Sequence, residues 1–324
     1  SSRGLLKGSR RKQRGDMTKM LGSIEEIQEV MEKHQYIADR PLATIIHLAK
    51  ALEKPVLLEG QAGVGKTDVA KVLAQVLSTK LIRLQCYEGI DASQALYEWN
   101  YPKQLLRIKL EESVACSSRE KIESEIFSES FLLKRPLLEA ITGNSASPPV
   151  LLIDEIDRAD DEFEGFLLEI LSDFQLTIPE IGTIKAKRRP FVTLTSNRTR
   201  DLGDALKRRC LYHWIDYPTF EKEYRIITTK IPGIDKLLAE KVCNFMQIVR
   251  GMDLFKKPGI AETLDWAVAL VMLNRDELDK ETVESTLGCI FKDNQDIQKI
   301  TGGQIETVLE KSKVVRGGGR GPCG

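Results

Sequence analysis

Residues 60–67 read G-Q-A-G-V-G-K-T, in which three glycines precede a lysine and a threonine. The apolar run 55–59 comes before them, and the segment 68–77 that follows has helical spacing. Successive backbone N–H groups of such a loop wrap a polyphosphate, and the next helix presents its positive end to the same anion. We expect Lys66 to contact the terminal phosphates and the Thr67 hydroxyl to bind Mg²⁺. The sequence therefore predicts a nucleotide phosphate site.

A second motif about ninety residues further on adds the carboxylates that hydrolysis needs. Residues 150–153 are an apolar run with the length and branching of a strand buried on both faces, and Asp154 and Glu155 follow it. At the carboxyl end of a parallel strand, Asp154 can hold Mg²⁺ through water, and Glu155 can act as general base on the attacking water. The further acidic residues between 157 and 162 are typical of a helix N-terminus.

A third polar strand end and an arginine pair complete the candidate residues. Residues 191–196 alternate apolar and hydroxyl side chains, which predicts a strand, and Asn197 ends it. Asn197 can orient the lytic water or contact the γ-phosphate. Arg208 and Arg209 end a short helical segment. They can stabilise the negative end of that helix, or project across a subunit boundary as an arginine finger on the nucleotide of a neighbour.

The surrounding elements have the order needed to position these residues. Strands are predicted at 55–59, 81–86, 150–154, 190–196 and 211–216, preceded by helices at 23–35 and 41–52. Such alternation implies a doubly wound parallel sheet with right-handed crossovers. Amphipathic helices are predicted afterwards at 219–230, 234–250, 260–274, 280–293 and 295–311. The pattern predicts an α/β core followed by a small all-α lid.

Two insertions interrupt the predicted core. The stretch 90–148 is too long for a plain crossover, and Tyr97, Trp99 and Tyr101 alternate within it. These aromatic residues either anchor a partner protein or pack the insertion onto the core. Segment 176–184 alternates on both sides of Pro-Glu-Ile-Gly, which is typical of a hairpin, and a basic run at 185–189 follows it.

The ordered motifs resemble those of AAA+ ATPases, and specifically those of the MoxR branch. Shorter strings resemble its CoxD-like members, which are associated with maturation of carbon monoxide dehydrogenase. They are Y-I-A-D-R at 36–40, L-I-R-L-Q-C-Y-E-G at 81–89, Y-E-W-N-Y-P at 97–102, and the segments 163–183 and 206–218. The resemblance covers residues 20–295.

The resemblance implies roles for individual residues. The nucleotide positions are Gly60, Gln61, Ala62, Gly63, Val64, Gly65, Lys66, Thr67 and Asp68, with Ile37 and Ala38 packing the adenine. Thr67 and Asp154 match the Mg²⁺ positions, Glu155 the general base and Asn197 the first sensor. Arg209 best matches the arginine finger, with Arg208 as second candidate. Many relatives carry a lid sensor arginine where this chain has none in 258–264, so Lys256, Lys257 or Arg250 would have to substitute.

The resemblance also implies an architecture and partners. It predicts a P-loop AAA+ core at 17–217, with insertions near 90–130 and 175–190, and a helical lid at 218–311. ATP and Mg²⁺ are the expected cofactors, and a homo-oligomeric ring, a hexamer in the family, is the expected assembly. A metalloenzyme client, of the molybdenum–copper hydroxylase class, and a von Willebrand A-domain adaptor are implied by the resemblance alone. A nucleic-acid motor and a nucleotide-gated binding module with negligible hydrolysis are the alternatives.

Composition and the chain ends add weaker expectations. Forty-eight basic and 48 acidic residues give no global field that favours a nucleic-acid or membrane partner. The six cysteines are scattered without metal-ligand spacing, which indicates reduced thiols in a cytoplasmic protein. The basic segment 1–16 and the glycine-rich segment 312–324 are predicted to be a disordered arm and tail. The longest uncharged apolar run, 267–273, is too short to span a membrane.

Overall fold

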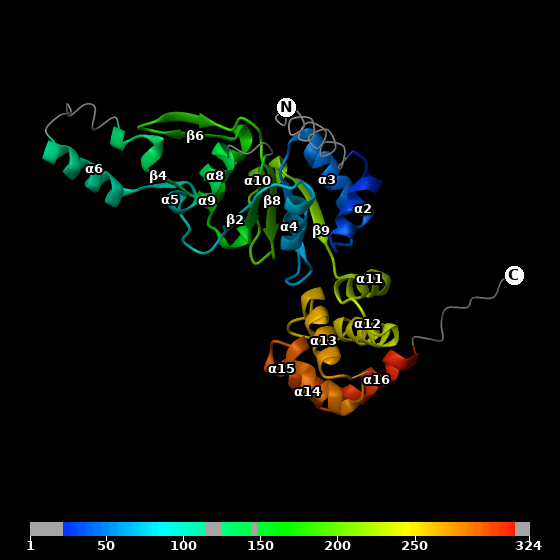
Figure 1. The fold of residues 1–324 in the computed structure, drawn as a ribbon. Coiled ribbons are helices and arrows are strands. Elements are labelled where there is room, and N and C mark those ends of the chain that lie inside the picture. The colour runs from blue at the N-terminus through cyan, green and yellow to red at the C-terminus, as the bar shows by residue number, and fades with distance from the viewer. Residues whose placement is uncertain (1–21, 115–124, 144–147, 276, 315–324) are drawn as a thin grey trace, which may run out of the picture. The chain divides into compact units, whose positions relative to one another are not determined.

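The computed structural model describes residues 22–114, 125–143, 148–275 and 277–314, and the predicted arm at 1–16 lies outside them. The chain divides into two compact units, each described by itself (Figure 1). One unit consists of the described residues up to His34 together with Ala38–Glu59 and Thr67–Trp214. The other consists of Gln35–Ile37, Gly60–Lys66 and the described residues from Ile215 onwards.

A five-stranded sheet forms the centre of the α/β part of the chain. Its strands are β1 (Val56–Gly60), β2 (Leu81–Gln85), β5 (Val150–Asp154), β8 (Phe191–Ser196) and β9 (Leu211–Ile215). Their order across the sheet is β2-β5-β8-β1-β9, and the pairs β2–β5, β5–β8 and β1–β8 are parallel. All residues of β1 and β5 are buried, as expected for strands covered on both faces. The predicted α/β fold with a parallel sheet is confirmed.

Helices flank this sheet. They are α2 (Ile24–Lys33), α3 (Arg40–Leu52), α4 (Lys66–Val76), α8 (Pro136–Thr142), α9 (Asp161–Asp173) and α10 (Asp204–Arg209), with the 3₁₀ turn η2 (Ile156–Arg158). A second 3₁₀ turn, η1 (Glu129–Phe131), lies in the first insertion, directly before β4 (Leu132–Lys134). Side chains of α8, α9 and α10 share one apolar cluster with alternate residues of β2, β5 and β8. In Figure 1, α8 and α9 are drawn to the left of the strands, and α2 and α3 to the right. Ser23, Asp39 and Asp160 cap α2, α3 and α9, which fixes where these helices begin.

The first insertion contains structure that the sequence pattern did not predict. Its described residues form α5 (Ala92–Ala95), β3 (Tyr97–Trp99), α6 (Tyr101–Val114) and β4 (Leu132–Lys134), and β3 pairs antiparallel with β4. Trp99 is 9% exposed and packs edge-on against Tyr97 and Phe127. Trp99 is therefore an interior residue of the insertion, which contradicts a role as an exposed anchor. Tyr101 is 60% exposed.

The second insertion is the predicted hairpin. Strands β6 (Gln175–Ile178) and β7 (Gly182–Lys185) pair antiparallel, with Thr177 opposite Thr183. The turn between them is Pro179-Glu180-Ile181, and Gly182 has a φ of +93°. The prediction of a hairpin over 176–184 is confirmed.

The C-terminal region is helical, as predicted. Its helices are α11 (Phe220–Lys230), α12 (Lys236–Arg250), α13 (Ile260–Met272), α14 (Lys280–Ile290), α15 (Asn294–Thr301) and α16 (Gln304–Val314). Phe245 and Trp266 are fully buried at the centre of its core, with ring centroids 4.9 Å apart. No helix in the described part of the chain has both the length and the apolar character that crossing a membrane requires.

Two predictions about the end of this region were wrong. The single helix predicted at 295–311 is two helices, because Gly302 and Gly303 separate α15 from α16 and Gly303 has a φ of +107°. A helix cannot continue through a left-handed residue of this kind. The predicted tail also begins too early, since α16 extends to Val314, and the remainder from 315 lies outside the described residues.

Candidate functional site

Two glycines give the phosphate loop its shape. The loop leaves β1 at Gly60 and enters α4 at Lys66. Gly63 and Gly65 have φ angles of +78° and +92°. These angles lie in the left-handed region, where a residue with a side chain is strained and glycine is not. The spacing of glycines in the motif therefore follows from the backbone geometry of the loop.

The Lys66 side chain lies along this loop. Its Nζ donates hydrogen bonds to the carbonyl oxygens of Gly60 at 2.8 Å and Gln61 at 2.6 Å, and the residue is 6% exposed. An ammonium held beside backbone N–H groups at a helix N-terminus is a combination that attracts phosphate. Asp68, in the first turn of α4, forms an ion pair with Lys71 at 3.0 Å. A contact of Asp68 with a cofactor stays a prediction.

Asp154, at the end of β5, meets the residue that follows Lys66 in the chain. The Thr67 hydroxyl donates to Asp154 Oδ1 at 3.1 Å across 87 residues of sequence. The hydroxyl of Thr195, on β8, donates to the same oxygen. Arg83, on β2, donates to Oδ2 through Nε at 3.0 Å and Nη2 at 2.6 Å. Asp154 is 3% exposed, and these donors compensate the charge of a carboxylate that is expensive to bury alone.

Asp154 and Thr67 have the chemistry of a Mg²⁺ site. Carboxylate and hydroxyl oxygens are the hard ligands that Mg²⁺ prefers, and protein-bound Mg²⁺ commonly completes its octahedral shell with water and substrate phosphates. The contact between the two side chains places such oxygens next to the start of α4, where the phosphate loop ends. The residues present therefore fit a Mg²⁺ ion that arrives with a nucleotide.

Glu155 is held beside Asp154 by its backbone and by one side-chain oxygen. Its φ of +54° turns the chain at the end of the strand, and its N–H donates to Thr195 Oγ1 at 2.9 Å. Gln85 Nε2 donates to Glu155 Oε2 at 3.1 Å, and Arg158 Nε lies 2.9 Å from the same oxygen. Within the described chain, Oε1 accepts no hydrogen bond. This carboxylate thus has one anchored oxygen and one that remains available.

Asn197 lies one residue beyond β8, next to the end of β5. The register places Ile153 opposite Leu194, so the two strands end side by side. Asn197 is partly buried, and its side chain makes no hydrogen bond to another residue that the structure describes. Just before it, Ser196 donates to Glu59 Oε1 at 3.3 Å. The structure thus brings Asn197 to the strand edge that carries Asp154 and Glu155, while its role as a sensor stays a prediction.

The two candidate arginines differ in their surroundings. Both are exposed at the end of α10. Arg209 donates through Nε to Ser172 Oγ at 2.9 Å and through Nη1 to the Ala205 carbonyl at 3.4 Å. Arg208 makes no such bond to any part of the chain that is described. Arg209 is therefore oriented by α9, whereas the position of the Arg208 side chain is set by α10 alone.

The residues predicted to pack the adenine lie between α2 and α3. Ile37 and Ala38 are each 7% exposed. The Ala38 carbonyl accepts a hydrogen bond from Gln28 Nε2 at 3.0 Å, and Asp39 then caps α3 by accepting from the Leu42 N–H. The segment is therefore fixed at both ends. Contact of Ile37 and Ala38 with a base stays a prediction.

Arg250 is one candidate for the missing lid sensor, and its side chain is buried and hydrogen-bonded within the helical region. Its Nη1 and Nη2 each donate to a carboxylate oxygen of Glu223 at 2.7 Å, and Nη2 donates to the Thr263 hydroxyl at 2.8 Å. Arg250 is 7% exposed and Glu223 is fully buried. Separating a buried pair of this kind costs about 3–5 kcal/mol. Lys256 and Lys257 are exposed and remain as candidates.

Sequence reasoning missed Arg83, Gln85 and the bridging role of Thr195. A signal was present, because Arg83 and Gln85 alternate with the buried Ile82 and Leu84 on β2 and so share one face of the strand. Arg83 Nη2 also donates to Gln85 Oε1 at 2.5 Å. These two residues therefore connect Asp154 to Glu155 from the neighbouring strand.

Cys86, which follows β2, is not a second reactive group at this edge. Burial raises the pKa of its thiol to about 12, and the negative charges of Asp154, Asp157 and Glu155 act in the same direction. The thiol therefore stays protonated near neutral pH and has little nucleophilic or metal-binding capacity. Three of the cysteines in the described part, Cys86, Cys210 and Cys243, are buried free thiols.

Comparison with known protein families agrees with this geometry. Residues 55–210, which include the phosphate loop, Asp154, Glu155 and Asn197, match the AAA domain of the dynein-related subfamily. Residues 55–210 carry the core of an AAA+ ATPase. The five-stranded parallel sheet and the helical region that follows are those of the AAA+ fold. An ATPase activity in general follows from the AAA+ core, whereas the match does not distinguish the MoxR branch from others.

Individual relatives of this AAA+ chain are distant. It is 28% identical to an uncharacterized protein of Staphylococcus haemolyticus over 254 residues, which are 75% of this chain and 86% of that protein. It is 24% identical to a Lon protease of Elusimicrobium minutum over 220 residues, which are 62% of this chain and 23% of the protease. Among solved structures, it is similar to the RuvB Holliday junction branch migration motor of Thermotoga maritima, at 20% identity and a TM-score of 0.42, over 92% of this chain and 81% of that one.

Proposed function

We propose that this chain is a Mg²⁺-dependent AAA+ ATPase of the MoxR kind, which forms a ring and uses ATP hydrolysis to remodel a protein client. The enzymatic part of this proposal rests above all on the bond between Thr67 and Asp154. That bond joins α4, the helix that follows the phosphate loop, to the end of β5, the strand that carries Asp154. The MoxR part rests on the resemblance of segments 36–40, 81–89 and 97–102.

The residues at this edge divide the work of hydrolysis. When bound, Mg²⁺ supplies positive charge to the phosphates and orients them. Lys66 binds the terminal phosphates, while Thr67 and Asp154 hold the metal. Glu155 accepts the proton of the attacking water at Oε1, because Oε2 is already occupied by Gln85 and Arg158.

Asn197 and the arginine pair complete this mechanism. Asn197 orients the water from the end of β8, beside the strand that carries the two carboxylates. Arg209 acts on the nucleotide of the adjacent protomer, where its charge stabilises the transferring phosphoryl group. Its bond to Ser172 orients the guanidinium from a second helix. The active unit is therefore a ring, a hexamer in the family that the chain resembles.

The client part of the proposal names a class of protein. By the same resemblance, the client is a metalloenzyme of the molybdenum–copper hydroxylase class, and a von Willebrand A-domain protein acts as adaptor. We also propose a cytoplasmic location for this reaction. The insertions carry the contacts to these partners, since neither is needed to hold the phosphate site.

The hairpin weakens the alternative of a nucleic-acid motor. Its turn carries Glu180, which is exposed, and the basic run lies at the base of the hairpin rather than at its turn. Within that run, Arg189 Nε lies 3.4 Å from Glu53 Oε2, and Arg189 Cζ lies 5.3 Å from the ring centroid of Phe174. A hairpin that tracks a phosphate backbone would be expected to present its cations at the exposed turn.

Trapping the client tests this proposal. The Glu155→Gln variant, loaded with ATP in its native host and crosslinked, is expected to retain hydroxylase subunits and a von Willebrand A-domain protein, whereas Lys66→Ala retains neither. Steady-state phosphate release tests the alternative of a nucleotide-gated binding module. Wild-type turnover well above that of Glu155→Gln would exclude it. Recovery of nucleic acid by the trap, with affinity that falls steeply as salt rises, would contradict the client assignment.

A further inference from the structure

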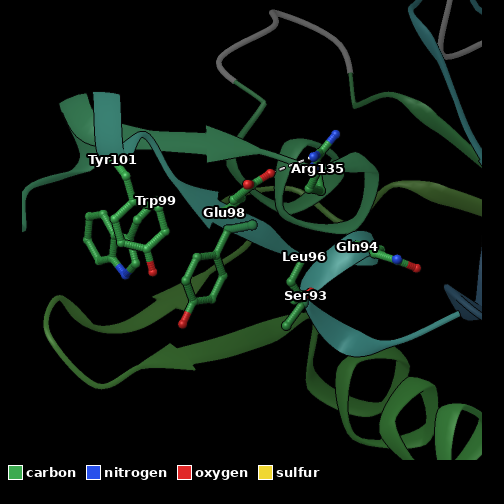
Figure 2. Close-up of a pocket in the computed structure, with 8 residues that line it drawn as sticks. Ser93, Gln94, Leu96, Glu98, Trp99, Tyr101 and Arg135 are labelled. Atoms are coloured by element: carbon green, nitrogen blue, oxygen red, sulfur yellow. Dashed lines mark hydrogen bonds and ion pairs between the residues drawn. The ribbon is translucent and has the colours of Figure 1, made fainter. Parts of the chain in front are cut away.

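A groove of about 640 Å³ runs along β3 in the first insertion (Figure 2). Eight residues line it. Seven come from the chain between the start of α5 and the start of α6, namely Ser93, Gln94, Leu96, Tyr97, Glu98, Trp99 and Tyr101. The eighth, Arg135, directly follows β4. In Figure 2, Tyr101 lies beside Trp99 at one end of the groove, and Ser93 and Gln94 lie at the other. The groove therefore follows the whole length of the strand.

The backbone of β3 has an unpaired edge. Arg135 N–H donates to the Leu96 carbonyl, and Asn100 N–H donates to the Phe131 carbonyl, so residues 96, 98 and 100 direct their backbone groups toward β4. Tyr97 and Trp99 alternate with them and direct their N–H and C=O groups to the opposite edge. In the described sheets, β3 has β4 as its one neighbour. Four strand-pairing groups thus point away from β4.

The side chains beside this edge favour an apolar contact. Tyr101 is 60% exposed and lines the groove, while Trp99 and Tyr97 form a packed aromatic wall behind it. Glu98 and Arg135 bond to each other at 2.6 Å, so the charged pair on the groove is mutually neutralised. A half-exposed tyrosine on a rigid aromatic wall is the kind of residue that anchors protein interfaces.

We propose that β3 accepts an extended segment of a partner protein as an added strand. The added strand pairs with the outward N–H and C=O groups of Tyr97 and Trp99, and every second side chain of the strand packs on Tyr101 and Trp99. The segment therefore alternates apolar and polar residues. Unpaired main-chain groups recognise an extended backbone through the same bonds that join strands in a sheet, and pockets beside the edge select the side chains. This inference rests on the proposed function, since it identifies how the client or adaptor docks.

Selection of peptides tests the proposal without knowledge of the partner. Random ten-residue peptides displayed on phage are selected on the full chain, and the recovered peptide is then synthesised in unmodified form and with alternate amides N-methylated. We expect the unmodified peptide to bind and N-methylation of one set of alternate amides to weaken it at least tenfold. If no peptide is recovered, or if neither N-methylated series weakens binding, the proposal is overturned.

Amide hydrogen exchange locates the contact. Peptide binding should slow exchange of the Tyr97 and Trp99 amides, while the Glu98 amide, which is already bonded to β4, changes little. Protection of Tyr97 and Trp99 that arises without peptide, as the chain is concentrated, would assign the edge to a second copy and overturn the proposal.

A matched pair of variants separates the groove from the rest of the insertion. Tyr101→Ser should weaken peptide binding by about 30-fold, a typical loss for an interface anchor. Leu106→Ser, at a site on α6 that is 59% exposed and does not line the groove, should leave binding unchanged. Equal losses in both variants would contradict the groove. Phosphate release is measured on the same preparations: intact ATPase without peptide binding overturns this inference alone, and peptide binding without ATPase overturns the proposed function alone.

Discussion

Two places in the α/β unit, the carboxyl end of the five-stranded sheet and the outer edge of β3, differ in how completely their polar groups are paired. At the carboxyl end of the five-stranded sheet, both oxygens of Asp154 accept hydrogen bonds, and Glu155 is held through its N–H and one oxygen. At β3, the outward backbone groups of Tyr97 and Trp99 have no neighbouring strand in the described sheets, and Tyr101 is 60% exposed. At the first site most charged groups are bonded, whereas at the second the outward backbone groups have no partner strand in the described sheets and an aromatic side chain is exposed.

The difference indicates two kinds of function. A buried carboxylate such as Asp154, with both oxygens bonded, holds its geometry while a substrate reacts, which is what electrostatic catalysis requires. An open strand edge can pair with a strand of another chain, and an exposed aromatic side chain beside it can anchor that contact. We therefore assign the chemistry to the first edge and recognition of other proteins to the second, and the following predictions test that division.

The largest expected effect concerns Arg209, which we propose acts on the nucleotide of a neighbouring subunit. Arg209→Ala should lower ATP turnover by about 10³-fold and leave ATP affinity unchanged, because a finger acts on transition-state charge. Arg208→Ala should have little effect, since Arg208 lacks the bond to α9 that orients Arg209. Phosphate release and nucleotide titration measure both quantities.

Mixed rings decide whether this arginine acts in trans. Rings formed from Arg209→Ala and Lys66→Ala subunits should recover part of the activity where an intact Lys66 site meets an intact Arg209. No recovery in rings shown to be mixed would count against the intersubunit site. A large loss in Arg208→Ala with a small loss in Arg209→Ala would exchange their roles.

The next effect separates the interior of the insertion from its surface. Trp99→Ala should lower the free energy of unfolding by about 3 kcal/mol, as expected for truncation of a buried aromatic side chain. Tyr101→Ala should change it by less than about 0.5 kcal/mol, because Tyr101 is largely exposed. Denaturant unfolding monitored at the insertion, with ATPase activity measured in parallel, checks both values. Equal destabilisation would show that Tyr101 also belongs to the interior.

A smaller effect is expected where one hydroxyl bonds both the Asp154 carboxylate and the backbone of Glu155. Thr195 donates to Asp154 and accepts from the Glu155 N–H. Thr195→Val keeps the shape but removes both bonds, and we expect turnover to fall by 10- to 100-fold, the usual range for residues that orient metal ligands. Thr195→Ser should restore most of the activity. If Thr195→Val is fully active, the network around Asp154 is not needed for catalysis.

The residues at the carboxyl end of the five-stranded sheet could be predicted from the sequence where they belong to short local motifs. The phosphate loop identifies Lys66 and Thr67 within eight residues, and the apolar run before Asp154 identifies a strand end. Parallel sheets bring such ends together, so the contact between Thr67 and Asp154 follows from the order of motifs. The roles of Arg83 and Gln85 did not follow, because they depend on the register of β2 against β5.

The unpaired edge of β3 could not be predicted from local motifs. Pairing of β3 with β4 joins Tyr97 to Lys134 across a long insertion, and both strands are only three residues long, too short for a periodic signal. The alternating aromatics were recognised, but whether Trp99 or Tyr101 faces solvent depends on the packing of Phe127. Likewise, the break at Gly302 and Gly303 lay inside a pattern that continued the helical period.

The central claim, that the carboxyl end of the sheet hydrolyses ATP with Glu155 as general base, is tested most directly by comparing ATP binding and turnover in two variants. Lys66→Ala should not bind ATP, because the charge that holds the phosphates in the ground state is gone. Glu155→Gln should bind ATP as tightly as the wild type and turn it over at least about 100-fold more slowly, because the carboxylate acts on water during the reaction alone. Retention of most of the turnover by Glu155→Gln would contradict the claim.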